Sequence, residues 1–195
     1  MRQSVKIMKT TALALLLSIA IPSLVLAAGS DTPTPVTKPT PEETCLKLGK
    51  VYNKETKKCE EKQAGLDQES IFESGRAYAY AGQYVEALAI FELAPEPFDP
   101  RVLNMKGFSH RKLGQIEKGM AYYKHSIAID PEYTLVREYY GEALLQIGDL
   151  AAAQNQLDTI KTLCKSEKCE PYQQLFAAIS DYKSGGDFEN RVSRW

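Results

Sequence analysis

Histidine is scarce in this chain, which has two in 195 residues, His110 and His125. No histidine pair stands at metal-ligand spacing, and neither a nucleophile elbow nor a phosphate-binding loop occurs. Ser109 and His110 are sequence neighbours, and neighbours on a helix point about 100° apart, so they cannot act as a nucleophile and its base. We therefore expect no enzyme activity, no cofactor and no metal site.

An excess of positive charge is also missing, because 24 lysines and arginines stand against 25 acidic residues. Three of the basic residues, Arg2, Lys6 and Lys9, precede an apolar run, and without them 21 basic residues face 25 acidic ones, a net charge of −4. A mildly acidic protein gives no reason to expect nucleic acid as a partner.

The N-terminus carries the one long apolar run, "TALALLLSIAIPSLVLA", which ends in the small residues Ala27 and Ala28. A basic start, an apolar stretch and small closing residues are typical of a secretory signal peptide. We expect residues 1–27 to be this signal, cleaved after Ala27 or Ala28, and the protein to be exported, to the periplasm of a Gram-negative bacterium. A retained membrane anchor is the alternative, although Pro22 interrupts the run.

Residues 28–44 are rich in proline and threonine and cannot build a core, so we expect a disordered or extended linker there. The tail, residues 185–195, shows no clear pattern.

The chain has four cysteines, and an even number in an exported protein indicates disulfides. Three connectivities are possible. We favour the two local ones, Cys45 with Cys59 and Cys164 with Cys169, while zinc binding is disfavoured because no second closely spaced pair exists.

The segment 45–65 is predicted to be a small disulfide-bridged hairpin. Val51 and Tyr52 favour a strand, and residues 53–56 could turn the chain. It is strongly basic, so it could contact an anionic envelope lipid or polysaccharide, although such a run of lysines is more often only a solvated face. The basic residues concerned are Lys47, Lys50, Lys54, Lys57 and Lys58.

The remainder of the chain repeats itself at steps of 32 and 34 residues. The matched columns are Gly75, Gly107 and Gly141; Gly82, Gly114 and Gly148; Ala87, Gly119 and Ala153; and Phe91, Tyr123 and Leu157. Each copy reads as two helices, with a glycine of the second column ending the first helix. We expect first helices at about 69–81, 101–113 and 134–147, and second helices at about 84–95, 116–129 and 150–163. Glycines of the first column should allow a close approach of paired helices.

This pattern resembles the tetratricopeptide repeat family. The residues that carry the resemblance include Gly75, Tyr78, Gly82, Ala87, Phe91, Leu103, Gly107, Gly114, Tyr123, Pro131, Gly141, Leu144, Gly148, Ala153 and Leu157. The layout is also similar to that of exported tetratricopeptide repeat proteins of alphaproteobacteria, a group that implies no particular activity. Gly119 departs from the family pattern, in which alanine is usual, and the first copy is two residues short.

The expected fold is therefore all-α: an α-solenoid of three helix pairs over residues 66–184, with repeats at about 68–99, 100–133 and 134–167. An apolar stripe at helical spacing in residues 170–184 predicts a capping helix. His110 shares a column with Tyr78 and Leu144, so it should pack between paired helices.

Stacked helix pairs present their first helices on one face, where partners bind. Helical phase puts nine candidate groove residues there: Phe72, Arg76, Tyr80, Asn104, Phe108, Arg111, Lys112, Glu138 and Glu142. We expect a non-catalytic interaction scaffold of the cell envelope that binds a protein segment, with the basic groove residues favouring an acidic group on it. The alternative is an envelope-binding module that uses the basic hairpin, with the repeats as a spacer. Oligomeric state is not predicted.

Overall fold

The structure is a computed structural model that describes residues 39–63 and 65–186. The predicted signal peptide, most of the predicted linker and residues 187–195 lie outside these ranges.

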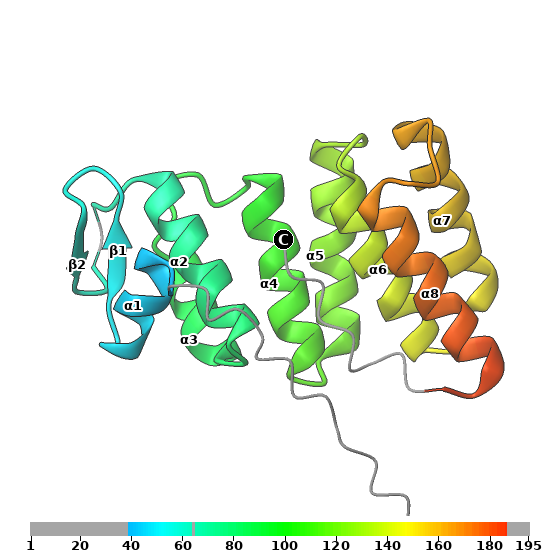
Figure 1. Ribbon diagram of the computed structural model, residues 1–195, viewed down its shortest axis with the longest axis horizontal. Coiled ribbons are helices and arrows are strands. Elements are labelled where there is room, and N and C mark those ends of the chain that lie inside the picture. Colours follow the sequence, from blue (N-terminus) through cyan, green and yellow to red (C-terminus); the bar gives the residue numbers. More distant parts are fainter. Residues whose placement is uncertain (1–38, 64, 187–195) are drawn as a thin grey trace, which may run out of the picture. The chain divides into compact units, whose positions relative to one another are not determined.

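Three helix pairs follow one another along the described chain, as predicted (Figure 1). They are α2 (Gln68–Tyr80) with α3 (Tyr84–Phe91), α4 (Pro100–Lys112) with α5 (Ile116–Ile129), and α6 (Thr134–Gln146) with α7 (Leu150–Cys164). The predicted capping helix is α8 (Glu170–Ser184), which packs on α6 and α7. The fold class is confirmed. In the described ranges, no helix combines the length and the apolar character that crossing a membrane requires.

The turns inside the pairs depend on glycine. Gly82, Gly114 and Gly148 have φ angles of +80°, +78° and +81°, a left-handed conformation that side chains disfavour. This column of the repeat therefore marks the ends of the first helices, as the sequence indicated.

Helix α3 is shorter than predicted, ending at Phe91 instead of near residue 95. The following segment contains Pro95 and Pro97, and a proline disfavours helical backbone at the residue before it. The two-residue deficit of the first repeat is thus taken up in this loop.

The segment before the repeats contains one helix that was not predicted. Helix α1 (Pro41–Lys47) starts at Thr40, whose hydroxyl accepts from the Glu43 amide, while the Glu43 carboxylate accepts from the Thr40 amide. This capping box and a proline in the first turn favour a helix over an extended chain. The prediction of a linker up to residue 44 is therefore wrong for residues 41–44.

The predicted hairpin is present as β1 (Val51–Asn53) and β2 (Lys58–Glu60), which pair antiparallel with Tyr52 opposite Cys59. The hairpin docks on α2. The amides of Tyr52 and Lys54 donate to the hydroxyls of Ser74 and Ser70 at 3.1 and 2.8 Å. These two serines satisfy amides at the edge of the hairpin, and Val51 is buried in the main core.

Both predicted disulfides are formed, between Cys45 and Cys59 and between Cys164 and Cys169. The first ties α1 to β2, and the second spans the turn between α7 and α8. Local connectivity is thereby confirmed over the two alternatives.

Replacing Cys45 and Cys59 with serine should destabilise the N-terminal segment by about 3 kcal/mol, because the bridge closes a loop of about 15 residues in the unfolded chain. Hydrogen exchange should show loss of amide protection in α1 and the hairpin, with α4 to α6 unchanged. The matched control, Cys164→Ser with Cys169→Ser, should affect α7 and α8 instead. Unchanged protection in α1 would contradict the expectation.

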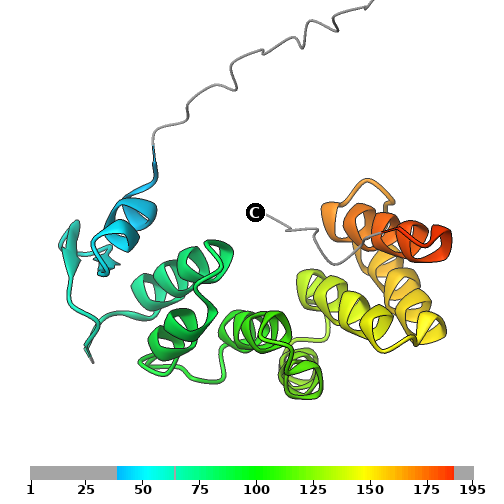
Figure 2. The ribbon, with the colours of Figure 1, turned by 90° about the horizontal axis from the view of Figure 1, so that it is seen from below.

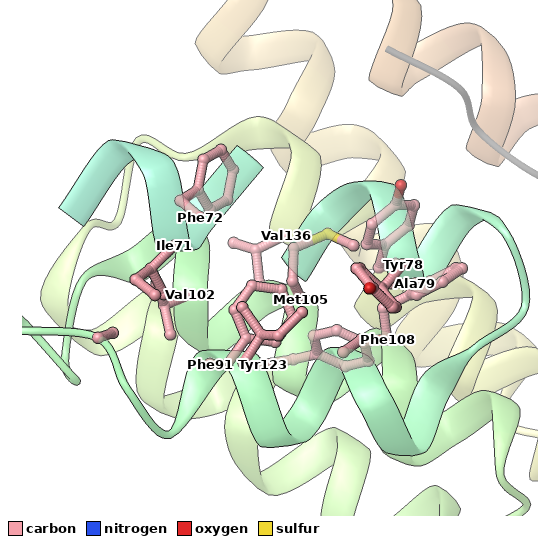
Figure 3. Packing of buried hydrophobic residues seen from close by; sticks show 14 of the residues in the cluster. Ile71, Phe72, Tyr78, Ala79, Phe91, Val102, Met105, Phe108, Tyr123 and Val136 are labelled. Carbon is pink, nitrogen blue, oxygen red and sulfur yellow. The ribbon is translucent and has the colours of Figure 1, made fainter. Parts of the chain in front are cut away.

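The buried apolar residues form two clusters, a larger one over α2 to α6 and a smaller one over α6, α7 and α8. In the larger cluster, apolar residues of first and second helices interlock, including Ile71, Met105, Phe108, Tyr123 and Val136 (Figure 3). The first-column glycines do permit close approach, and their partners are large side chains. A Cβ on Gly75 would overlap the Phe91 ring, and one on Gly141 would lie 2.6 Å from Leu175 of α8. At Gly107 and Gly119 the backbones of the two paired helices, α4 and α5, meet directly.

The departure at Gly119 has a steric cause. A Cβ there would lie 2.8 Å from the Gly107 carbonyl oxygen and 3.1 Å from the Arg111 Cβ. The pair of α4 and α5 therefore packs too closely for the alanine that is usual in this column.

Candidate functional site

The nine predicted groove residues all belong to α2, α4 and α6. These three helices lie on one side of the stack, opposite α3, α5 and α7 (Figure 2). Most of the predicted residues do not line an open groove. Six of the nine are buried, namely Phe72, Asn104, Phe108, Arg111, Glu138 and Glu142. For these six the expectation of an exposed binding surface is wrong, while Arg76, Tyr80 and Lys112 are half-buried.

Aromatic packing across the repeats explains this burial. The Phe108 ring lies between Tyr80 of α2 and Tyr139 of α6, at centroid distances of 5.7 and 5.3 Å. The Tyr80 and Tyr139 hydroxyls are hydrogen-bonded to each other at 2.9 Å. Large rings on neighbouring first helices thus fill the space that smaller side chains would leave as a groove.

Arg111 belongs to a buried polar network that joins α4, α5 and α6. Its Nη2 lies 2.6 Å from Glu142 Oε2, its Nε donates to the Tyr123 hydroxyl at 3.3 Å, and its Nη1 to Gln146 at 3.4 Å. Burial alone would lower the pKa of Arg111, but its interactions with the Tyr123 hydroxyl and the Glu142 carboxylate, both hydrogen-bonded to it, outweigh burial and raise the pKa. Burial also raises the pKa of Tyr123 to about 12, so this phenol stays protonated and neutral. Arg111 therefore holds helices together and is not presented to an acidic partner.

Asn104 is wholly buried on the same face. Its Nδ2 donates to the Tyr133 hydroxyl at 3.4 Å, and its Oδ1 has no hydrogen-bond partner among the described residues. Rotating the amide by half a turn would let Oδ1 accept from that hydroxyl instead. Its role is thus internal to the fold.

The open site lies at the N-terminal end, between α1 and α2. A pocket of about 370 Å³ there takes in Arg76 and Tyr80, the two half-buried groove residues of α2. We call it the α1–α2 pocket. Its full lining is Thr40, Glu42, Glu43, Leu46, Glu73, Arg76, Ala77, Tyr80 and Ala81.

The lining of the α1–α2 pocket is partly apolar and partly charged. Leu46, Ala77 and Tyr80 are its large or apolar members, and three carboxylates stand against one guanidinium. Arg76 is itself ion-paired with Glu73, one turn away on α2. The charge that remains for a ligand is therefore negative, which favours a basic group over the acidic one expected from the sequence.

The sequence could not reveal the α1 half of this pocket. Glu42, Glu43 and Leu46 come from a segment interpreted as linker and hairpin, and none shares the period of the repeats. The one available signal was "TPEE", a threonine followed three residues later by glutamate, which is a capping-box pattern.

The five lysines of the basic segment are not equally available. Lys50 is ion-paired with Glu61 at 2.8 Å and Lys54 with Glu69 at 3.7 Å. Lys47, Lys57 and Lys58 are exposed. The envelope-binding alternative therefore depends on three side chains and not on five.

Ser109 and His110, residue types that often act in catalysis, have structural roles here. His110 stacks on Tyr122 of α5 with centroids 5.3 Å apart, and its Nδ1 lies 2.8 Å from Gln115 Oε1. Ser109 donates to the Met105 carbonyl at 2.8 Å. The predicted packing of His110 between paired helices is confirmed. In residues 39–63 and 65–186, no group of histidine, cysteine and carboxylate side chains could hold a metal ion.

One of the three helix pairs matches a known family model. Residues 100–133, which span α4, α5 and the following turn, match the tetratricopeptide repeat family model. The crystal structure of a tetratricopeptide repeat protein from Parabacteroides merdae is similar to this chain, with 20% sequence identity and a TM-score of 0.49. The match covers 60% of this chain and 46% of that one, so this chain spans less than half of its neighbour's length. No curated protein matches the sequence.

Proposed function

Because this chain is a tetratricopeptide repeat protein, we propose that it is a non-catalytic scaffold that binds a segment of a partner protein in the α1–α2 pocket. Domains built from these repeats generally bind proteins or peptides, so the kind of function follows from the fold. The observation that supports the location is the open pocket beside Arg76 and Tyr80, on a face where six of the nine candidate residues are buried.

The charge and apolar character of the pocket lining favour a particular kind of partner segment. The pocket's volume is about 370 Å³, and its lining includes apolar side chains and two more carboxylates than guanidinium groups. A segment with a lysine or arginine next to an apolar residue fits this combination. We place the scaffold outside the cytoplasm, because the apolar N-terminal run resembles a signal peptide and the four cysteines are paired.

A photo-crosslinking amino acid at Ala81 tests the proposal. Ala81 is exposed at the pocket's edge, so crosslinking in the producing cell should give a discrete adduct whose peptide maps to one basic segment. Adding Glu42→Lys reverses the charge of one lining side chain. This should weaken binding of a basic segment by about 1.4 kcal/mol and so reduce that adduct by roughly tenfold.

The same crosslinker at Ala151, which is exposed on α7, is the matched control. Adducts of equal yield and identity from both positions, or an Ala81 adduct that Glu42→Lys leaves unchanged, would show that the α1–α2 pocket is not the binding site.

A further inference from the structure

The two disulfides lie in different surroundings. In the first, Cys45 is 1% exposed, although its partner Cys59 is partly exposed. In the second, Cys164 and Cys169 are both partly exposed, in the turn between α7 and α8 (Figure 1). The four residues between this second pair line an open hollow, and three of them are exposed. A thiolate must reach a sulfur atom to open a disulfide, so access favours the second bridge.

The two cysteines of the second bridge stand at opposite kinds of helix end. Cys164 is the last residue of α7, where the helix dipole places partial negative charge, and Cys169 is the N-cap of α8, where the charge is partly positive. In the described chain the Cys169 side chain makes no capping hydrogen bond, so a thiolate there can accept one from the first turn of α8. Opening of this bridge is therefore favoured when the negative charge is left on Cys169.

The charged side chains of the turn add to this preference. Lys165 and Lys168 adjoin the two cysteines in sequence, and both are exposed. Glu167 is ion-paired with Lys161, and Glu170 in the first turn of α8 is the other acidic group. Three lysines thus stand against two glutamates, which leaves a net positive charge beside the bridge and stabilises a thiolate formed there.

The first bridge lacks these features. Burial of Cys45 blocks attack on its sulfur. Attack on Cys59 would instead leave a thiolate on Cys45, where water cannot solvate the charge. Neither direction of exchange is favoured, so we expect this bridge to stay oxidised under conditions that open the second one.

We propose that Cys164–Cys169 is a thiol–disulfide exchange site that takes two electrons from a dithiol. One thiolate of the dithiol attacks Cys164 Sγ, the Sγ–Sγ bond breaks, and its electron pair leaves on Cys169. The second thiolate of the dithiol then displaces Cys164, so the dithiol becomes a disulfide and its two protons pass to the two cysteines. Reduction removes the covalent link across the turn from α7 to α8. This inference goes beyond the proposed function, and the α1–α2 pocket takes no part in it.

Timed reduction of the purified full chain by dithiothreitol, without denaturant, tests the proposal. Samples are quenched with an alkylating agent, and mass spectrometry of the peptides gives the fraction of free thiol at each pair. Cys164–Cys169 should open roughly tenfold faster than Cys45–Cys59, or more. Equal rates, or faster opening of Cys45–Cys59, would overturn the proposal.

Reduced glutathione tests which sulfur is attacked. This monothiol forms a mixed disulfide that rapid alkylation traps. Glutathione should be found on Cys164 and the alkyl group on Cys169. The reverse labelling would show that Cys169 is not the leaving group.

Charge reversal tests the contribution of the lysines. Lys165→Glu with Lys168→Glu should slow the opening of Cys164–Cys169 about fivefold, because it replaces positive with negative charge beside the leaving thiolate. The matched control, Lys57→Glu with Lys58→Glu, changes two exposed lysines near the other bridge and should leave that rate unchanged. A rate that the first pair of substitutions leaves unchanged, or that both pairs slow equally, would contradict stabilisation of the thiolate by its neighbours.

Discussion

Replacing Arg111 with methionine is expected to lower the free energy of unfolding by about 3–5 kcal/mol, the usual effect of breaking a buried ion pair. The guanidinium and the Glu142 carboxylate are 1% and 3% exposed, so water cannot solvate the carboxylate when the arginine is gone. Tyr123 and Gln146 would lose the same donor. Urea unfolding followed by circular dichroism measures the change.

The double variant Arg111→Met with Glu142→Leu should regain most of that loss, because two apolar side chains of similar volume need no charge partner. Lys118→Met, on the exposed side of α5, should change stability by less than about 0.5 kcal/mol. If Arg111→Met alone costs under about 1 kcal/mol, the ion pair does not hold the repeats together in the way its burial implies.

Replacing Gly107 with valine should cost about 4 kcal/mol, toward the upper end for overpacked cores. The new Cβ would lie 2.6 Å from the Tyr123 ring and 3.0 Å from the Gly119 carbonyl oxygen. The ring is fully buried and the carbonyl is backbone, so neither can move aside cheaply. The midpoint of thermal or urea unfolding should fall accordingly.

Ala121→Val provides the control for Gly107→Val. Ala121 is exposed on α5, so its replacement adds a β-branched side chain to a helix without a steric clash and should cost less than about 1 kcal/mol. Equal effects of the two substitutions would mean that helix propensity, and not the close approach of α4 and α5, governs the response at residue 107.

The repeats could be predicted because each periodic column has one simple physical cause. Gly114 follows from a left-handed turn and Gly107 from a close helix contact, and both recur at a fixed step. The disulfides followed from sequence proximity in the same way. Helix ends were accurate to about one residue except where Pro95 and Pro97 interrupted α3.

Whether side chains on the first-helix face are buried or exposed could not be predicted. Helical phase correctly put Asn104, Phe108 and Arg111 on that face, but phase says nothing about what lies above a side chain. Their burial depends on contacts between residues about 30 positions apart, such as Phe108 with Tyr139. Such pairings depend on the distance between stacked helices, which the sequence of one repeat does not contain. The α1–α2 pocket was missed for the same reason.

The hydrogen bond between Tyr80 and Tyr139 bears on how the repeats unfold. In a solenoid whose units touch only their nearest neighbours, a terminal unit can melt alone and leave the rest intact. Here the first unit is bonded directly to the third, past the second. If α2 unfolds, α6 loses a hydrogen-bond partner and α4 loses a packing partner. Unfolding from the N-terminal end therefore also destabilises the third helix pair. The three units should behave as one cooperative block and not as a row of separable ones.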